Sequence, residues 1–592
     1  MSSALGGLKC SLAMVGKHFR LVLMLRKGVW FSSNVGLLWI LLVGLSAAAS
    51  KPNIILVTLE STRADRAGFL GSKRGVTSNL DALAQKSLVF ERAYSQAPLT
   101  VVSHATILSG TYPQTHQASP FGGPISPSVP WLPELLKARG YRTVAFVGLR
   151  DLDPKNGMAQ GFDRGFESYD AGFRLPEKGL LRSQSVERSG DQVVTRATQW
   201  LKKSAQPFFL WVHLADPQAP YASYDRAVAA ADAAIGKLVA ALRTQNLYDD
   251  AIVVAAADHG ESLGAHGEDT HGVFLYDDTI LVPLVVKLPQ SQMAGKRVSG
   301  RVRLLDVAPT ILEAAGVPVP AQMQGQSLLR IAKSSPTADQ SVYSRSDYGQ
   351  RGFAWSGLQS WRASKYLYIR SPKPELYDLT SDPGATKNLA QTSKGTTDTI
   401  AAQLDAFNKR FSSGGKATEL SSSEMQKLAS LGYVGLQKSA SGTDAVTGTD
   451  PKDVIAIANK VGSAWQSLDD GKPEKAVPVF QQVIGAAANI YLAQYGLGLA
   501  LAQQQQCSKA IDPLRKAIEL QPDSAWAHYQ MGFCLTKTGD FKTALVHLEI
   551  AASRLPESGD AQALLGQAYE KLGRAEDAKR ARAKASQLGT KN

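Results

Sequence analysis

The stretch that decides the fold is Ala251-Ile-Val-Val-Ala-Ala-Ala-Asp-His-Gly260, an apolar run that ends in a carboxylate, an imidazole and a glycine. Small and branched apolar residues without alternation are typical of a strand covered on both faces, as in a parallel sheet flanked by helices. In such sheets the ligand crevice lies beyond the carboxyl ends of the strands. We therefore expect Asp258 and His259 at a ligand-binding edge. A core strand followed by a turn, with His259 only hydrogen-bonded, is the alternative.

Two other apolar runs end in the same way. Residues 53–59 are followed by Glu60, and residues 208–214 carry His213 near their end, with Asp216 just beyond. Unpaired charges at three buried strand ends are costly to desolvate. Because a bound cation removes that cost, the three runs together predict a metal site at this edge of the sheet.

The length and charge of the chain limit what it can be. With 592 residues the chain is too long for a single hydrophobic core, so two or more domains are expected. Its 44% hydrophobic and 20% charged residues are typical of a globular protein. The net charge of +14 first suggests nucleic acid, but five basic residues lie before residue 50, where no acid occurs, and the rest are spread without a dense basic run. We therefore expect no nucleic-acid partner.

Residues 1–50 are typical of a signal peptide or an N-terminal anchor. A basic region precedes the apolar run 35–45, and three alanines at 47–49 supply a small-residue cleavage pattern. The apolar run is shorter than the roughly 20 residues of a membrane span, which favours cleavage over a retained anchor. We expect export to the bacterial periplasm or cell envelope, with membrane association through this segment as the alternative.

Residues 51–411 alternate strand and helix patterns, which predicts an α/β domain. A short sheet at about 342–388 is appended to it, and a linker rich in Ser, Gly, Thr and Lys follows at 412–450, with one short helix at 425–433. The expected strands are 53–59, 141–147, 208–214, 251–257 and 282–287, and the expected helices are 79–86, 101–108, 133–138, 191–203, 224–245 and 305–315.

Residues 451–592 repeat with a period of 34. The glycines at 498, 532 and 566 keep this interval, as do the alanines at 510, 544 and 578. This period predicts four tetratricopeptide-type helical pairs, with small residues where two antiparallel helices touch. A concave surface for a protein or peptide partner is the functional interpretation, and a packing or dimerisation appendage is the alternative.

Two cysteines fall within these repeats. Cys507 begins a second helix and Cys534 lies late in the next first helix. In an exported protein a disulfide between them and a pair of buried thiols are both compatible with the sequence. Their placement at helix ends that can lie close together favours the bridge slightly.

Thr100 is the candidate nucleophile of the first domain. It lies at or beside the N-cap of the helix expected at 101–108, which Gly110 ends. A helix N-terminus offers free amides and a positive dipole end to a phosphate or sulfate group. A hydroxyl at this place can bind a metal and act as a nucleophile, or it can simply cap the helix.

These segments resemble, in order, the sulfatase branch of the alkaline phosphatase superfamily. The resemblance covers about residues 51–435 and is carried by residues 51–65, 78–84, 93–110, 258–264, 271–272, 282–284, 306–312 and 375–379. It implies a mixed, mostly parallel sheet flanked by helices, to which the repeats add an all-α solenoid.

The resemblance also implies a ligand set. The first metal carboxylate of the family falls on Glu60, its nucleophile on Thr100, and its second ligand pair on Asp258 and His259. Three oxygens and one imidazole suit one divalent ion, Zn, Mn, Mg or Ca, without choosing among them.

Three histidines complete the expected site. His104 stands where true sulfatases carry an arginine, and His271 matches a histidine that contacts substrate or a second metal in relatives that transfer phosphorus groups. Gln218 replaces a histidine that faces the transferred group, so His213 or His271 would supply the acid for the leaving group.

The departures from the family indicate phosphorus chemistry. True sulfatases convert a Cys or Ser to formylglycine, and threonine cannot give that aldehyde. The set Glu, Thr, Asp and His resembles that of lipoteichoic acid synthases and phosphoethanolamine transferases. We therefore expect a metal-dependent hydrolase or transferase acting by phosphoryl transfer on phosphoric esters, with sulfuric esters second. The alternative is a catalytically inactive, sulfatase-like envelope protein that acts as a binding scaffold.

Overall fold

The computed structural model describes residues 14–15, 18–19, 51–175, 186–219, 222–334, 339–411, 421–431, 433 and 446–589. Two short strands, β1 (Met14–Val15) and β2 (His18–Phe19), belong to a unit of their own, Met1–Lys51, and all other elements belong to the unit Pro52–Asn592. Apart from these two strands, the predicted signal or anchor lies outside the described residues. In the described part of the chain, no helix has both the length and the apolar content that crossing a membrane requires.

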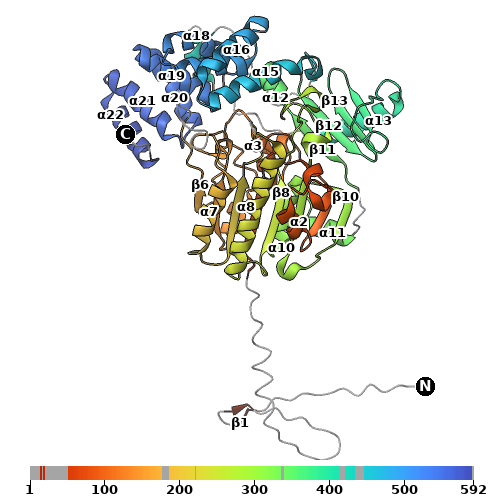
Figure 1. Ribbon diagram of the computed structural model, residues 1–592. Helices are drawn as coiled ribbons and strands as arrows, with labels where there is room; N and C mark the ends of the chain where they lie inside the picture. The colour runs from red at the N-terminus through yellow and green to blue at the C-terminus, as the bar shows by residue number, and fades with distance from the viewer. Residues whose placement is uncertain are drawn as a thin grey trace, which may run out of the picture. The chain divides into compact units, whose positions relative to one another are not determined.

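One large sheet forms the centre of the first domain (Figure 1). Within the described residues it has eight strands in the order β10-β4-β9-β8-β3-β7-β5-β6, and only β9 runs antiparallel to its neighbours. The mixed, mostly parallel sheet is thereby confirmed. The strands are β3 (Ile54–Leu59), β4 (Leu88–Tyr94), β5 (Arg142–Val147), β6 (Ser168–Asp170), β7 (Phe208–Leu214), β8 (Ile252–Ala257), β9 (Leu281–Lys287) and β10 (Arg297–Arg303).

Helices cover this sheet, whose central strands are buried along their whole length. α2 and α7 both pack against the long helix α8, while α3, α5 and α10 contact one another. The helices of this domain are α2 (Ser78–Ala84), α3 (Thr100–Ser109), α4 (Pro113–His116), α5 (Leu132–Lys137), α7 (Gly190–Leu201), α8 (Tyr224–Thr244), α9 (Asp277–Ile280), α10 (Val307–Ala314), α11 (Leu328–Ser334) and α12 (Tyr348–Phe353). Single-turn 3-10 helices are η1 (Ala64–Arg66), η2 (Gly68–Leu70), η3 (Arg150–Leu152), η4 (Ala265–Gly267), η5 (Pro289–Ser291) and η6 (Leu304–Asp306).

A second, antiparallel sheet follows where the sequence predicts an appended one. Its order is β11-β12-β13-β14, and α13 (Lys394–Phe411) packs against β12 and β13. The strands are β11 (Val342–Ser346), β12 (Leu358–Ala363), β13 (Tyr366–Arg370) and β14 (Glu375–Asp378). Within the linker, α14 (Ser422–Ser430) is the short helix expected near residue 425, and it contacts the repeats.

The C-terminal region consists of paired helices, as the 34-residue period predicts. Gly498 and Gly532 lie where the two helices of a repeat touch, since a Cβ at either glycine would come within 2.5 Å of Leu514 or Leu548. The helices are α15 (Pro451–Asp469), α16 (Pro473–Ala486), α17 (Tyr491–Gln503), α18 (Cys507–Leu520), α19 (Ala525–Thr538), α20 (Phe541–Arg554), α21 (Gly559–Lys571) and α22 (Ala575–Gln587).

Three strands of the large sheet were absent from the sequence prediction. β4 and β10 carry charged residues such as Glu91, Arg92, Arg297 and Arg301, because they lie at or next to one edge of the sheet, and β6 is a three-residue strand at the other edge. A search for uninterrupted apolar runs finds central strands and passes over edge strands.

Candidate active site

The sheet brings two predicted ligands to the same edge. β3 and β8 are neighbouring parallel strands whose last residues, Leu59 and Ala257, are register partners. Glu60 and Asp258 follow directly, and the Asp258 amide donates to the Leu59 carbonyl at 3.1 Å. Because parallel strands end at one edge, the two carboxylates leave the sheet side by side. Both side chains are fully buried.

Thr100 reaches this edge from the first residue of α3. Leu99 is the N-cap and no side chain caps the helix, so the threonine hydroxyl is not used for capping. Instead it donates to Glu60 Oε1 at 2.7 Å and lies 3.4 Å from His259 Nε2. The expected placement at or beside the N-cap is confirmed, and the capping alternative is wrong.

The four predicted ligands converge. His259 Nε2 lies 3.3 Å from Glu60 Oε1 and 3.6 Å from Asp258 Oδ2. Glu60 Oε2 and Asp258 Oδ2 are buried without a hydrogen-bond partner. Orphaned carboxylate oxygens beside a hydroxyl and an imidazole form a donor set that fits one divalent cation. Glu60, His259 and His271 also form a possible metal-binding group, with ligand atoms within 4.8 Å of one another.

The electrostatics of the cluster favour a cation as well. Burial, together with the charge of Glu60, raises the pKa of Asp258 well above its usual range. Burial also works to raise the pKa of Glu60, but the neighbouring His213 and His259 outweigh it and hold that pKa well below its usual range. For His259, burial works to lower the pKa, whereas the charges of Asp258 and Glu60 raise it to about 10. The buried acids therefore attract positive charge.

Backbone geometry holds the ligands in place. The amides of Ser61 and His259 both donate to Asp258 Oδ1, at 3.0 and 2.7 Å. Ser61 has a φ of 45°, a left-handed conformation uncommon for a residue with a side chain. Gly260 packs so closely on the next segment that a Cβ would lie 2.1 Å from the Asp278 carbonyl oxygen. The glycine of the Asp-His-Gly run is therefore required by a close backbone contact.

A fully buried layer lies behind Glu60. Thr58 Oγ1 lies 3.1 Å from His213 Nδ1, 3.0 Å from His104 Nε2 and 3.0 Å from Trp211 Nε1. His213 Nε2 in turn is 3.2 Å from Glu60 Oε2, and His104 Nδ1 is 2.8 Å from the Thr100 carbonyl oxygen. Thr58 was not predicted as a site residue, because its signal is a single hydroxyl inside an apolar run.

His271 occupies a different position from the other two predicted histidines. It lines a cavity of about 390 Å³ together with Thr100 and Gln218, whereas His104 and His213 are not among the residues that line it. Its Nδ1 lies 3.2 Å from Glu261 Oε1, and its ring centroid is 4.4 Å from that of His259. Of the three histidines, His271 is thus the one placed next to both the ligand cluster and the cavity.

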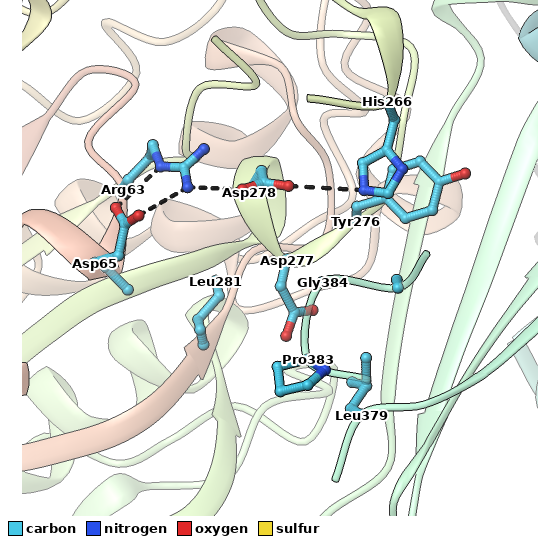
Figure 2. A pocket seen from close by; sticks show the side chains of 12 residues that line it. Arg63, Asp65, His266, Tyr276, Asp277, Asp278, Leu281, Leu379, Pro383 and Gly384 are labelled. Carbon is cyan, nitrogen blue, oxygen red and sulfur yellow. Dashed lines mark hydrogen bonds and ion pairs between the residues drawn. The ribbon is translucent and has the colours of Figure 1, made fainter. Parts of the chain in front are cut away.

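A second, smaller cavity of about 150 Å³ lies nearby (Figure 2). Its charged groups have ion-pair partners: Arg63 pairs with Asp65 and Asp278 at 2.8 and 2.7 Å, His266 faces Asp278 at 3.8 Å, and Asp277 pairs with Arg362 at 2.9 Å. None of the predicted site residues is among those that line it. The cavity over Thr100 is therefore the candidate active site.

Comparison with known proteins agrees with this architecture. Residues 52–317 match the sulfatase family model, and residues 269–410 match the model described as N-sulphoglucosamine sulphohydrolase, C-terminal. Residues 498–539 and 535–586 match two models of the tetratricopeptide repeat.

Individual relatives are distant. The ulvan-active sulfatase of Formosa agariphila is 25% identical over 420 residues, which cover 61% of this chain and 81% of the relative. Human arylsulfatase K is 23% identical over 438 residues, which cover 58% of this chain and 80% of the relative. Among solved structures, a 2-O GAG sulfatase gives a TM-score of 0.52 at 21% identity over 61% of this chain and 92% of that one. The phosphonate monoester hydrolase of Agrobacterium radiobacter gives a TM-score of 0.51 at 18% identity, and the match covers 61% of this chain and 96% of that one.

The mixed sheet and the match to the sulfatase model support an ester hydrolase of the alkaline phosphatase superfamily, with a possible metal-binding site at the strand ends. Residues 52–317 thus form a domain that matches the sulfatase family, and tetratricopeptide repeats follow this domain.

Proposed function

We propose that this hydrolase uses Thr100 as its nucleophile and acts on phosphoric esters by phosphoryl transfer to water or to an acceptor hydroxyl. The observation that carries the proposal is the contact of the Thr100 hydroxyl with Glu60 Oε1 at 2.7 Å, at the first residue of α3. A hydroxyl that faces a carboxylate and an imidazole, rather than capping its helix, is placed to attack.

The preference for phosphorus follows from the identity of residue 100. Relatives with sulfatase names act on sulfate esters, but formylglycine forms from Cys or Ser, and threonine cannot give that aldehyde. A direct attack by a secondary alkoxide suits phosphoryl transfer, in which charge spreads over equatorial oxygens next to helix amides and a cation. Sulfuric esters are the second substrate class in this proposal.

The ligand cluster would hold one divalent ion, Zn, Mn, Mg or Ca, through Glu60, Thr100, Asp258 and His259. When bound, the ion would lower the pKa of the Thr100 hydroxyl and stabilise negative charge on the transferred group. Coordination by Glu60, His259 and His271 is the other arrangement that the geometry allows.

The protein side chains would carry the protons. As Thr100 Oγ1 bonds to phosphorus, its proton passes to Glu60 Oε1, the acceptor of its hydrogen bond. The bond from phosphorus to the leaving oxygen breaks, and His271, which lines the cavity and is held by Glu261, protonates the departing alkoxide. Water or an acceptor hydroxyl then bonds to phosphorus while its proton passes to His271. The bond from phosphorus to Thr100 Oγ1 breaks, and Thr100 recovers its proton from Glu60, so that both side chains return to their starting state.

His104 and His213 act as positioning residues in this proposal. Both are fully buried, and they face Thr58, Glu60, Asp258 and the Thr100 carbonyl rather than the cavity. Burial, together with the charge of His213, lowers the pKa of His104 to about 3 and keeps it neutral. We also propose that the protein is exported to the periplasm or cell envelope, on the pattern of residues 1–50, and that the repeats bind a protein or peptide partner.

Metal analysis and ester hydrolysis test the function together. Wild type, Thr100→Ser and Thr100→Ala would be assayed with bis(4-nitrophenyl) phosphate, 4-nitrophenyl phosphate and 4-nitrophenyl sulfate. We expect one bound divalent ion, hydrolysis of a phosphoric ester by wild type, partial activity of Thr100→Ser, and loss of at least a hundredfold in Thr100→Ala. A covalent phosphoryl group trapped on Thr100 and identified by mass spectrometry would establish the nucleophile. If wild type binds no metal and matches Thr100→Ala on every ester, the protein is an inactive binding scaffold and the proposal is wrong.

A further inference from the structure

The cavity over Thr100 has one wall from the catalytic domain and another from the repeats. Three repeat helices contribute side chains to it: α15, α17 and α19. Trp465 and Gln466 come from α15, Tyr495 from α17 and Trp526 from α19. The candidate active site is thus incomplete without the helical region.

Hydrogen bonds fix the repeat wall against the catalytic domain. Asn459 makes a reciprocal pair with the η4 region: its Nδ2 donates to the Gly267 carbonyl at 2.8 Å, and its Oδ1 accepts from the Asp269 amide at 3.1 Å. Trp526 Nε1 donates to the Gly157 carbonyl at 3.0 Å. α17 is buried along its whole length and packs on α12 as well as on other repeat helices. A helix that is apolar all round is expected where both faces are covered.

The repeat wall is rich in aromatic rings. Trp465 and Tyr495 have ring centroids 5.6 Å apart, and Tyr495 stacks on Tyr491 at 5.8 Å. From the catalytic side, Phe121 stacks on Tyr348 at 5.6 Å. All five residues line the cavity. Aromatic walls provide large, rigid contact area for another flat ring at low cost in side-chain entropy.

Two polar atoms of the lining are left without partners. The indole Nε1 of Trp465 is a buried donor, and Gln218 Oε1 is a buried acceptor, and neither has a hydrogen-bond partner. Buried polar atoms are seldom left unpaired unless a ligand or water uses them. A hydroxyl-bearing or ether-bearing ligand would satisfy both.

The charges of the lining disfavour a polyanion. Its carboxylates are Asp151, Glu268, Asp269 and Asp469, and its one guanidinium, Arg150, is paired with Asp469 at 3.5 Å. Burial raises the pKa of Asp151 and raises that of Glu268 to about 8, and neither acid supplies positive charge. The part of the lining that the structure describes thus offers no basic surface to a chain of sulfate or phosphate groups.

We infer that the repeats form the substrate-binding wall of the active site, and that they bind the alcohol part of the ester through an uncharged ring face. The ester chemistry rests on the proposed function, but the ring-binding wall does not. Aryl and pyranose rings share this chemistry, and the repeats thereby act as a specificity element besides any partner that they bind.

Calorimetric binding to the full-length protein tests the wall without turnover. The probes are benzyl alcohol, methyl glucoside and a heparin oligosaccharide, and the variants are Trp465→Leu, Trp465→Phe and Phe533→Leu. Phe533 is the matched control because it lies on α19 but lines a different cavity. We expect wild type and Phe533→Leu to bind one of the two ring compounds, Trp465→Leu to bind it about tenfold more weakly, and Trp465→Phe to recover most of the loss. Which ring compound binds distinguishes an aryl from a pyranose ester.

Kinetics with matched esters separate this inference from the proposed function. For benzyl and ethyl phosphate, Trp465→Leu should raise KM about tenfold for the benzyl ester alone and leave kcat within about twofold. The inference is overturned if no ring compound binds wild type, if Trp465→Leu binds as wild type does, or if heparin binds more tightly than both rings. If a ring compound binds but no ester is hydrolysed, the proposed function is contradicted, whereas the inference that the repeats form a ring-binding wall still holds.

Discussion

At the residue scale, Asp258 is a buried carboxyl group with one oxygen that accepts no hydrogen bond. Burial and the neighbouring Glu60 both raise its pKa, and its Oδ2 has no hydrogen-bond partner. Its Oδ1 accepts two backbone hydrogen bonds that an asparagine oxygen would also accept. We therefore expect the Asp258 carboxylate to bind a cation rather than to stabilise the fold.

Asp258→Asn should have opposite effects with and without metal. In chelator, the variant should melt at or above the wild-type temperature, because the raised pKa of Asp258 favours its neutral form and asparagine keeps the two backbone hydrogen bonds. With Mn²⁺ or Zn²⁺ added, the melting temperature of wild type should rise by several degrees, whereas that of the variant should hardly change. Thermal melts of both proteins under both conditions measure this. A variant that melts well below wild type in chelator would show that the carboxylate supports the fold directly.

Thr58 joins three buried donors or acceptors behind the site. Thr58→Val removes the oxygen that lies near His104, His213 and Trp211 and should cost about 2–3 kcal/mol of unfolding free energy. Thr58→Ser keeps the hydroxyl and should cost less than about 1 kcal/mol. Chemical denaturation of both variants measures the difference. Equal losses would mean that the methyl group matters and the hydroxyl does not.

The sequence located the ligands but not their supports. Glu60, Asp258 and His259 could be predicted because each follows a buried apolar run, and a strand end has a defined place in a parallel sheet. Thr58 and Glu261 could not, because a hydroxyl in a strand or an acid in a loop has no periodic signal. Whether His213 would line the cavity or lie behind Glu60 depended on the side-chain direction at the end of β7.

At the scale of elements, glycines determine how closely the repeat helices pack. Gly532→Ala should lower the unfolding free energy by about 1–3 kcal/mol, although alanine favours helix, because its Cβ would lie 2.5 Å from Leu548. Gly485→Ala in α16 has no atom within 4 Å of the new Cβ and should raise stability by about 0.5–1 kcal/mol. Denaturation midpoints of the two variants check the contrast, and a stabilising Gly532→Ala would contradict it.

Cys507 is the first residue of α18 and Cys534 lies near the C-terminal end of α19, and both are buried free thiols with their Sγ atoms 2.8 Å apart. The predicted bridge remains a prediction. Mild oxidation of purified protein should link the two within one chain, as peptide mapping without reductant would show. If both thiols stay modifiable after unfolding of the oxidised protein, the two helix ends are not held together.

The elements that sequence analysis recovered share one property. β7, β8 and β3 are buried on both faces, and α8 and the repeat helices have long periodic patterns. β9 was expected as a strand, but no local pattern indicated that it runs antiparallel to β4 and β8. The sequence also could not predict that α15, α17 and α19 pack over Thr100, because a repeat period does not indicate which domain the helices cover.

At the scale of the whole molecule, buried histidines make stability depend on pH. Burial lowers the pKa of His528 to about 4 and that of His116 to about 3. Because the unfolded chain takes up these protons near pH 6.5, stability is full above that pH and falls as the pH drops toward 4, by up to about 1.4 kcal/mol per unit and group.

His528→Gln isolates this effect from other titrating groups. Between pH 7 and pH 5, wild type should lose about 2 kcal/mol more unfolding free energy than the variant. Chemical denaturation at both pH values measures the two losses. Equal losses would mean that His528 is protonated in the folded protein or exposed to water.

The central claim is that Glu60, Thr100, Asp258 and His259 surround one cation. Anomalous diffraction from crystals of the protein loaded with Mn²⁺ or Zn²⁺ tests it most directly. We predict a single strong peak within about 2.0–2.3 Å of an oxygen of Glu60, Thr100 and Asp258 and of Nε2 of His259. No peak at this place, or a peak bound by other residues while the four side chains point into separate pockets, would contradict the account.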